Sequence, residues 1–409
     1  MKKSTNQKKL DKNIKVKKLK SAHLVLLNIL ILLGAILIQY NPPPKNKEVT
    51  PFYLGVTFCG ETTTEAKFLI DKTKDYSNLF VLQSGPISKN ESAINEICNY
   101  AVGSGLNIIV YFGWFDIDHP WQIPWLDYAK NQWEDNFLGV YYYDEPGGTH
   151  IDYNWSRLFM GMKEQNSTIY QTFSPTIESY LQGTLQRDYD QAADHFISSL
   201  QNNHDINELK SRSIKTFTSD YALYWFDYIG GYDVVFTEFG WNNSIVQEIA
   251  LVRGAAQIQN KSWGAIITWK YMNQPYLDTG DTIYYQMRTA YEAGAKYVVI
   301  FNYAEINGDC CGIMQDEHFK ALERLWNEVV SEQKIEQGSI KAEHLLVLPK
   351  NYGYGMRRPD DKIWYWGADE ETTQIWNYTR KLVLQYGLKL DIAYEDTKFP
   401  ATNQYALVF

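Results

Sequence analysis

The chain has few of the residues that carry several common kinds of chemistry. Its 409 residues include only four cysteines and no C-x-x-C pair, which argues against zinc ribbons and thiol redox motifs. It contains no G-x-S-x-G elbow and no glycine-rich phosphate loop, so acyl transfer and nucleotide binding are unsupported. Basic residues are also scarce beyond position 21, where 30 Lys and Arg stand against 47 Asp and Glu. Such an acidic body argues against nucleic acid as a partner.

Apolar and aromatic residues, by contrast, are plentiful. Hydrophobic residues make up 45% of the chain and aromatic residues 15%, with 13 Trp and 31 Tyr. This composition supports a sizeable core and excludes disorder, collagen and coiled coil for the bulk of the chain. The aromatic excess has two interpretations, which stay open here. The rings either fill the core and the surface in the ordinary way, or form a surface that stacks on flat sugar rings.

A lysine-rich stretch and a long apolar run open the chain. Residues 1–21 hold nine Lys against Asp11, and residues 22–40 contain no Asp, Glu, Lys or Arg. Nineteen helical residues span about 28 Å, close to the thickness of a bilayer core. No small-x-small cleavage site precedes Pro42, so we predict an uncleaved transmembrane anchor at 22–40, with a cleaved signal peptide as the alternative. The positive-inside rule then predicts a cytoplasmic tail (1–21), a linker (41–50) and an extracytoplasmic remainder.

The rest of the chain alternates short apolar runs with longer amphipathic stretches. The runs are rich in β-branched and aromatic residues and are apolar throughout, which is typical of parallel strands buried on both faces. The predicted strands are 52–58, 78–83, 106–112, 137–143, 214–218, 232–237, 264–269 and 297–303. The predicted helices between them include 61–75, 89–104, 244–260 and 281–294. Eight such units predict an α/β fold, a (β/α)₈ TIM barrel over residues 51–335.

Two further segments complete this organisation. Residues 145–213 form an insertion with a helical pattern, although 168–173 is also compatible with an additional strand. Residues 336–409 predict a small α/β domain of βαβ type, with strands at 343–348, 389–394 and 405–409 and a helix at 371–386.

Cysteine and asparagine positions bear on the predicted exterior location. Cys98 is predicted to be a free buried thiol. Cys59 and the pair Cys310 and Cys311 follow the first and last strands, which are neighbours in a closed barrel, so one disulfide there fits the pattern. Six N-x-S/T sequons favour a glycoprotein. They begin at Asn90, Asn154, Asn166, Asn242, Asn260 and Asn377.

Active sites of such barrels lie at the carboxyl ends of the strands, so the residues that follow each strand are the candidates. Glu145 follows the fourth strand and Glu238 the sixth. A carboxyl group placed directly after an apolar strand is costly to ionise, which perturbs its pKa. Two facing carboxyl groups can then divide the work of glycoside cleavage, one donating a proton and the other attacking the anomeric carbon. The competing interpretation is that these carboxylates cap the next helix or pair with Lys270 and Arg288.

The segments around Glu145 and Glu238 resemble the motifs of a known family. Tyr143-Asp144-Glu145-Pro146 and Thr237-Glu238-Phe239-Gly240-Trp241 are similar to the acid/base and nucleophile motifs of the large clan of retaining glycoside hydrolases that includes the cellulase-like families. Trp269-Lys270 resembles the clan's strand-end Trp. The resemblance implies that Glu145 is the acid/base and Glu238 the nucleophile. The chain departs from the clan in having Asp144 where Asn stands and in placing Glu238 after the sixth strand rather than the seventh.

Other residues at strand ends are predicted to contact the substrate. Neighbours on a strand point to opposite faces, so only one of Asp144 and Glu145 is expected to enter the site. The predicted substrate-binding residues are Asp144, Trp114, Asp116, Asp220, Trp241, Trp269, Lys270 and Tyr303. The loop Asp116-Ile117-Asp118-His119 is more typical of a solvated turn than of a metal site, and neither a metal nor a cofactor is predicted.

The sequence thus predicts a membrane-anchored, extracytoplasmic glycoside hydrolase acting on a carbohydrate. Two alternatives stay open: a non-catalytic glycan-binding protein that keeps the barrel, and a purely structural protein of the cell surface.

Overall fold

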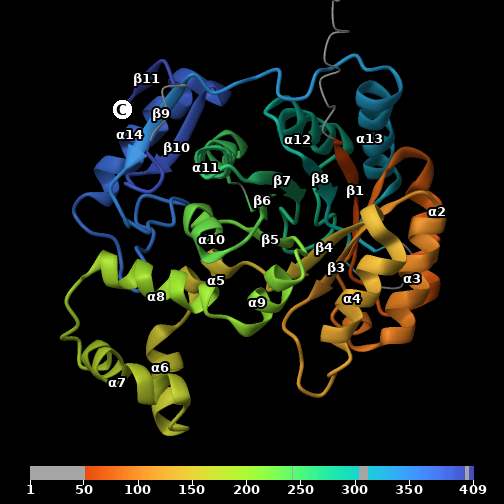
Figure 1. Ribbon diagram of the computed structural model, residues 1–409. Helices are drawn as coiled ribbons and strands as arrows, with labels where there is room; N and C mark the ends of the chain where they lie inside the picture. The colour runs from red at the N-terminus through yellow and green to blue at the C-terminus, as the bar shows by residue number, and fades with distance from the viewer. Residues whose placement is uncertain (1–50, 242, 304–311, 401–404) are drawn as a thin grey trace, which may run out of the picture. The chain divides into compact units, whose positions relative to one another are not determined.

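A closed barrel of eight parallel strands dominates the computed structural model, which describes residues 51–241, 243–303, 312–400 and 405–409. Each strand pairs with the next along the chain, and β8 pairs with β1 to close the ring (Figure 1). The strands are β1 (Tyr53–Phe58), β2 (Leu79–Leu82), β3 (Asn107–Phe112), β4 (Phe137–Tyr142), β5 (Thr216–Asp220), β6 (Val234–Phe239), β7 (Ser262–Ile267) and β8 (Tyr297–Ile300). Each overlaps its predicted counterpart, and the predicted (β/α)₈ TIM barrel is confirmed.

Alternation along each strand explains why the runs are apolar throughout. On β6, Val234 and Phe236 belong to the cluster that fills the inside of the barrel, whereas Val235 and Phe239 pack outward against the helices. The inner cluster also holds Tyr141 of β4 and Phe217 of β5. Because both faces are buried, polar residues are confined to the strand ends.

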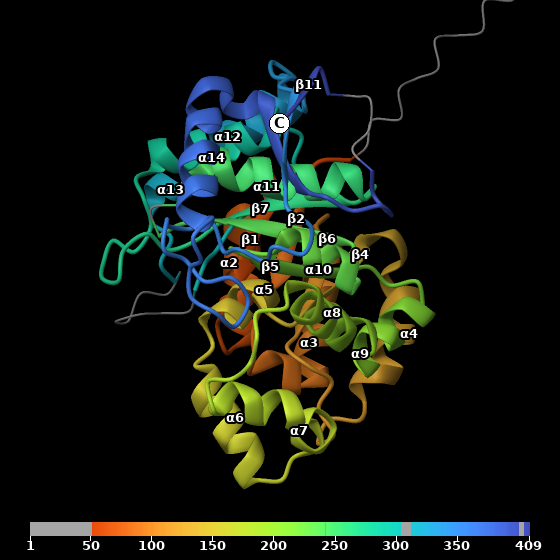
Figure 2. The ribbon, with the colours of Figure 1, turned by 90° about the vertical axis from the view of Figure 1, so that its left-hand side faces the viewer.

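Helices connect the strands and cover the outside of the barrel (Figures 1 and 2). Many begin at a side-chain cap; for example, Thr62 and Glu65 form a capping box at the start of the first described helix. The barrel helices are α2 (Thr63–Thr73), α3 (Glu91–Gly103), α4 (Gln122–Trp133), α10 (Tyr224–Gly230), α11 (Ile245–Ile258), α12 (Gly280–Glu292) and α13 (Asp316–Trp326).

The insertion between β4 and β5 is helical, as predicted. Its helices are α5 (Pro146–Asp152), α6 (Trp155–Glu164), α7 (Thr168–Leu181), α8 (Tyr189–Gln201) and α9 (His204–Ser211). The segment 168–173 opens α7 and is not a strand, because the Ser167 side chain caps the backbone N–H of Tyr170 and starts a helix there.

The C-terminal segment forms a three-stranded parallel sheet in the order β10-β9-β11, with one helix. Its elements are β9 (His344–Leu348), α14 (Thr372–Tyr386), β10 (Leu390–Tyr394) and β11 (Leu407–Val408). This sheet packs on α11 through a fully buried ion pair, in which Arg253 Nε donates to Asp391 Oδ1 at 2.7 Å. Figure 2 shows α14 and this sheet at the end of the molecule remote from α6 and α7. Residues Phe52–Phe409 form one compact unit.

The predicted single-pass membrane location is contradicted. Within the described ranges no helix is long and apolar enough to cross a bilayer. The longest helix there, α14, has 15 residues, or about 22 Å, against about 30 Å for the hydrocarbon core. The segment 22–40, on which the prediction of an anchor rested, lies outside the described residues, as do the tail and most of the linker.

The predicted glycosylation also lacks support. Among the sequons, Asn90 and Asn154 use their side-chain oxygens as helix N-caps for α3 and α6. Cys98 is a free and fully buried thiol, as expected. The suggested disulfide involves Cys310 and Cys311, which lie outside the described residues.

Candidate active site at the carboxyl end of the barrel

Side chains alternate between the inside and the outside of the barrel along each strand, and this alternation places both Glu238 and Ser219 inside the barrel. Glu238 shares the inward register of Val234 and Phe236 on β6, and Ser219 shares that of Phe217 on β5. The Ser219 hydroxyl donates a 2.7 Å hydrogen bond to Glu238 Oε1. Both side chains are almost completely buried.

Glu145 reaches the same interior through an unusual backbone. Strand β4 ends at Tyr142, and both Tyr143 and Glu145 then adopt left-handed conformations, with φ of 52° and 51°. Such a conformation is uncommon and strained for a residue with a side chain, and residues held in this way tend to cluster at functional sites. The Glu145 N–H donates to the Ser219 carbonyl at 3.1 Å, which ties this turn to β5.

The carboxyl groups of Glu145 and Glu238 are in direct hydrogen-bonding contact. Burial, followed by the nearby Asp144 charge, raises the pKa of Glu145 to about 7. Burial, together with the charges of Glu145 and Asp144, raises the pKa of Glu238 well above its usual range. Since like charges in contact cannot both ionise at low cost, the pair shares a proton, which the more buried Glu238 carries.

Asp144 joins this pair, contrary to the expectation that only one of two consecutive residues would enter the site. The Tyr141 hydroxyl, from inside the barrel, donates to Asp144 Oδ1, and the Ser219 hydroxyl lies 3.4 Å from the same oxygen. Although Asp144 is exposed to solvent on one side, the protein around it raises its pKa by desolvation. The strict alternation of a strand does not apply here, because the chain has already left β4 and turned twice through left-handed φ.

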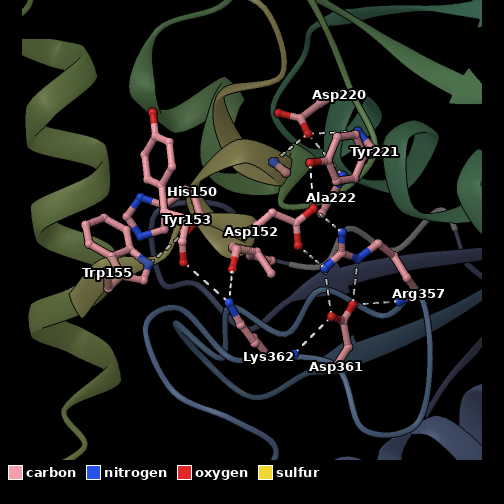
Figure 3. Close-up of polar contacts among 12 residues, drawn as sticks. His150, Asp152, Tyr153, Trp155, Asp220, Tyr221, Ala222, Arg357, Asp361 and Lys362 are labelled. Carbon is pink, nitrogen blue, oxygen red and sulfur yellow. Dashed lines mark hydrogen bonds and ion pairs between the residues drawn. The ribbon is translucent and has the colours of Figure 1, made fainter. Parts of the chain in front are cut away.

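Asp220, predicted to bind substrate, is enclosed behind this turn. Its register on β5 is opposite to that of Ser219, so it points outward toward α5 and is fully buried. Its carboxylate accepts backbone N–H groups from Gly147, Gly148, Tyr221 and Ala222 at 2.6–3.1 Å (Figure 3). We therefore assign Asp220 to positioning the turn that carries Glu145.

Asp227 of α10 lies against Asp220 and is equally buried. The two carboxyl groups lie close enough for the charge of Asp220 to act on Asp227. Burial, followed by the Asp220 charge, raises the pKa of Asp227 well above its usual range, which favours the neutral carboxyl group. Burial raises the pKa of Asp220 to about 7, although four backbone N–H bonds act against this rise.

The far end of α5 is held by the C-terminal segment. Arg357, in the connection between β9 and α14, donates to Asp152 at 2.8 Å and to Asp361 at 2.8 Å (Figure 3). Burial acts to raise the pKa of Asp152, but the bonds from Arg357 lower it overall. Lys362 also donates to the Ile151 carbonyl at 3.0 Å. The helix that begins directly after Glu145 is thus fixed at both ends.

Aromatic side chains gather after β6, β7 and β8. The ring centroids of Trp241 and Trp269 lie 6.4 Å apart, and those of Trp269 and Tyr303 lie 5.4 Å apart. Trp241 and Tyr303 are more than 40% exposed, so part of this aromatic group faces solvent. The Trp269 indole N–H is buried without a hydrogen-bond acceptor among the described residues. Trp114, after β3, is 60% exposed and separate from this group.

Lys270 and Asp116, both predicted to bind substrate, are engaged elsewhere. Lys270 Nζ lies 2.7 Å from Asp278 in an ion pair. Asp116 accepts the backbone N–H of Asp118 and lies 3.2 Å from His119 Nδ1. No group of three or more His, Cys, Asp and Glu suited to a metal occurs in the described part of the chain.

Sequence reasoning missed three residues that matter to this geometry: Tyr141, Ser219 and Asp227. The ring of Tyr141 lies in the inner cluster of the barrel, as its place on an apolar strand suggests, but its hydroxyl reaches Asp144. The inward register of Ser219 beside Glu238 could have been found from the strand pattern. Nothing in the sequence around Asp227 distinguishes it from an exposed helical acid.

Comparison with known proteins adds support for the fold. No protein-family model matches the chain, and no curated protein sequence matches it. Among solved structures, the GH5_18 protein from Streptomyces cattleya in complex with GlcNAc superposes with a TM-score of 0.50 at 10% identity, over 88% of this chain and 98% of that one.

Two further structures are more distant. The GH99 endo-alpha-mannosidase from Bacteroides thetaiotaomicron gives a TM-score of 0.42 at 10% identity, over 70% of this chain and 99% of that one. A 3-deoxy-D-arabino-heptulosonate 7-phosphate synthase from Thermotoga maritima gives 0.37 at 8% identity, over 72% and 93%. Likenesses this distant carry no argument about chemistry. The chain has a (β/α)₈ TIM-barrel fold, which it shares with this GH5_18 protein.

Proposed function

We propose that this protein cleaves glycosidic bonds by a two-carboxylate mechanism, with Glu145 as the acid/base and Glu238 as the nucleophile. The observation that carries the proposal is the contact between these two carboxyl groups, which come from different strands and share a proton. Inverting enzymes hold the two groups about 6.5–9.5 Å apart to admit a water, and retaining enzymes about 5–5.5 Å apart. Two groups that contact each other leave no room for that water, and we propose retention because the shorter of these separations needs the smaller movement apart.

The proposed roles require the shared proton to move. In the free site Glu238 carries it, whereas attack on the anomeric carbon needs Glu238 ionised and Glu145 protonated. The hydrogen bond between the two groups provides the path for this transfer. The Ser219 hydroxyl then stabilises the Glu238 carboxylate, because it donates to Oε1 at 2.7 Å. A sugar ring placed between the groups would separate them toward the retaining distance.

The surroundings support a neutral polyhydroxylated substrate. Asp144 offers an exposed carboxylate for a sugar hydroxyl, and Trp241 and Tyr303 offer partly exposed rings for stacking on a sugar face. Apolar sugar faces pack on aromatic rings as other apolar surfaces do. We include Asp144, Trp241, Trp269 and Tyr303 among the proposed substrate contacts, and Trp114 as an outlying one.

The test is hydrolysis of a panel of aryl glycosides and polysaccharides by the full chain. Glu145→Gln and Glu238→Gln should each lower kcat by at least about a thousandfold. A matched control is Glu248→Gln, because Glu248 is equally buried but hydrogen-bonds to Tyr224 rather than to the pair. Product NMR should show retention at the anomeric carbon. Full activity of either Gln variant would overturn the assignment.

One observation favours a second function, glycan binding without turnover. Burial, followed by the charges of Glu145 and Asp144, raises the pKa of Glu238 and so favours its neutral form in the free site. A site that never ionises Glu238 would hold a sugar without attacking it. Glycan binding by the parent, with no hydrolysis across the panel and with binding lost in Trp241→Ala, would establish this function instead.

A further inference from the structure

A cavity lined by charged and polar side chains opens at the other end of the barrel, where the strands begin. It has a volume of about 420 Å³ and lies at the amino ends of β5, β6, β7 and β8. Its walls include Lys210, Lys215, Lys261, Asp233 and Tyr297. Volumes of a few hundred Å³ are typical of small-molecule sites, and this one is independent of the carboxylate pair at the opposite end.

The charge around this cavity is opposite to that of the whole protein. The chain carries a net charge of −9, yet three lysines line the cavity and Lys296 adjoins it through Tyr297. Asp233 is the acidic residue in the lining, and it pairs with Lys261 at 3.0 Å. Lys210, Lys215 and Lys296 have no ion-pair partner among the described residues.

The lysines at this end of the barrel disfavour one another's charged forms. Burial and the charge of Lys261 lower the pKa of Lys210, and burial and the charge of Lys215 lower the pKa of Lys296. Repulsion of this kind is relieved when an anion binds between the ammonium groups. Lysine is a common ligand of phosphate, to which it presents a compact charge with three donors.

We propose that this cavity binds a phosphate-type oxyanion, either free or carried on a molecule the size of a sugar. Lys210 and Lys215 in the lining, with Lys296 beside it, are unpaired ammonium groups that match a ligand with more than one negative charge. The Asn260 and Ser213 side chains in the same wall add neutral polar groups for the remainder of a larger ligand, and the Tyr297 ring adds an apolar surface.

The test measures binding to the full chain by calorimetry and thermal unfolding, with sodium chloride matched for ionic strength. The probes are inorganic phosphate, glucose 6-phosphate and glucose. Phosphate should bind and raise the Tm, because a ligand of the folded state stabilises it. Lys210→Gln/Lys215→Gln should weaken binding by about tenfold or more. The matched control, Lys320→Gln/Lys381→Gln, changes two exposed lysines on α13 and α14 and should bind as the parent does.

The relative affinities of the two phosphate probes distinguish the possible ligands. Tighter binding of glucose 6-phosphate than of phosphate identifies a phosphate ester as the ligand, and equal binding identifies the free ion. In the absence of ligand the cavity variant should melt at or above the parent's Tm, since it removes repulsion, which distinguishes lost binding from lost folding. No binding of either phosphate, or equal binding by the cavity variant and the parent, would overturn the proposal. Neither result depends on whether the carboxylate pair hydrolyses glycosides.

Discussion

The Asp220 carboxylate accepts a 2.6 Å hydrogen bond from the backbone N–H of Gly147, two residues beyond Glu145. With three further N–H bonds, this contact fixes the first turn of α5 onto β5. The position of Glu145 is therefore determined by a buried acid that has no contact with solvent.

Replacing that acid by its amide should destabilise the protein. In Asp220→Asn the side-chain NH₂ faces backbone donors, so at least one buried N–H loses its acceptor, at a cost of about 1–3 kcal/mol. We expect a lower free energy of unfolding in urea. Asp188→Asn is the matched control, because Asp188 is an exposed N-cap of α8 and Asn caps equally well. Equal stabilities of Asp220→Asn and the parent would contradict the positioning role.

The carboxylate pair should make stability depend on pH. The pKa of Glu145 and that of Glu238 are both raised in the folded protein, so the fold keeps protons that the unfolded chain releases. Stability is then greatest below the ordinary carboxyl pKa of about 4.3 and falls as the pH rises through about 7. Guanidinium unfolding across this range measures the effect.

Glu238→Gln should remove much of this dependence. The amide stays neutral at every pH, so the variant should match the parent near pH 4 and exceed its free energy of unfolding by about 1–2 kcal/mol near pH 8. Glu164→Gln, an exposed change on α6, serves as the control and should follow the parent at both values. A constant difference between Glu238→Gln and the parent at all pH values would show that the Glu238 proton is not held by folding.

The buried ion pair between Arg253 and Asp391 should be costly to break on one side. Arg253→Ala leaves the Asp391 charge in the interior, and we expect a loss of about 3–5 kcal/mol in the free energy of unfolding. Arg253→Met/Asp391→Leu removes both charges and should recover most of that loss. Urea unfolding of the two variants decides the matter, and an equal loss in both would mean that packing rather than charge holds the junction.

A close backbone approach at the same junction gives an independent prediction. A Cβ on Gly254 of α11 would lie 2.3 Å from the Ile392 carbonyl oxygen of β10, so Gly254→Ala should lower the Tm. The control is Gly161→Ala on α6, where no atom lies within 4 Å of the new methyl group. Since alanine is the better helix former by about 0.5–1 kcal/mol, this control should raise the Tm slightly. A higher Tm for both variants would refute the close contact.

The barrel could be predicted because the pattern that identifies its strands lies within each strand's own sequence. Strands buried on both faces must be apolar at every position, and the runs around Val110 and Val235 show this without reference to any partner. The contact between Glu145 and Glu238 could be anticipated from strand ends alone. The inward orientation of Asp144 could not be predicted, because it depends on the left-handed backbone of Tyr143 and Glu145, which no side-chain pattern requires. The partnership of Asp220 with Asp227 likewise depends on tertiary burial of α10.

The brace formed by Arg357 makes the last part of the chain a structural support for the region around Glu145. Cleavage in the connection between β9 and α14, which carries Arg357, would weaken the hold on Asp152. Limited proteolysis there would therefore loosen the region around Glu145 from a distance, without cutting any strand of the barrel.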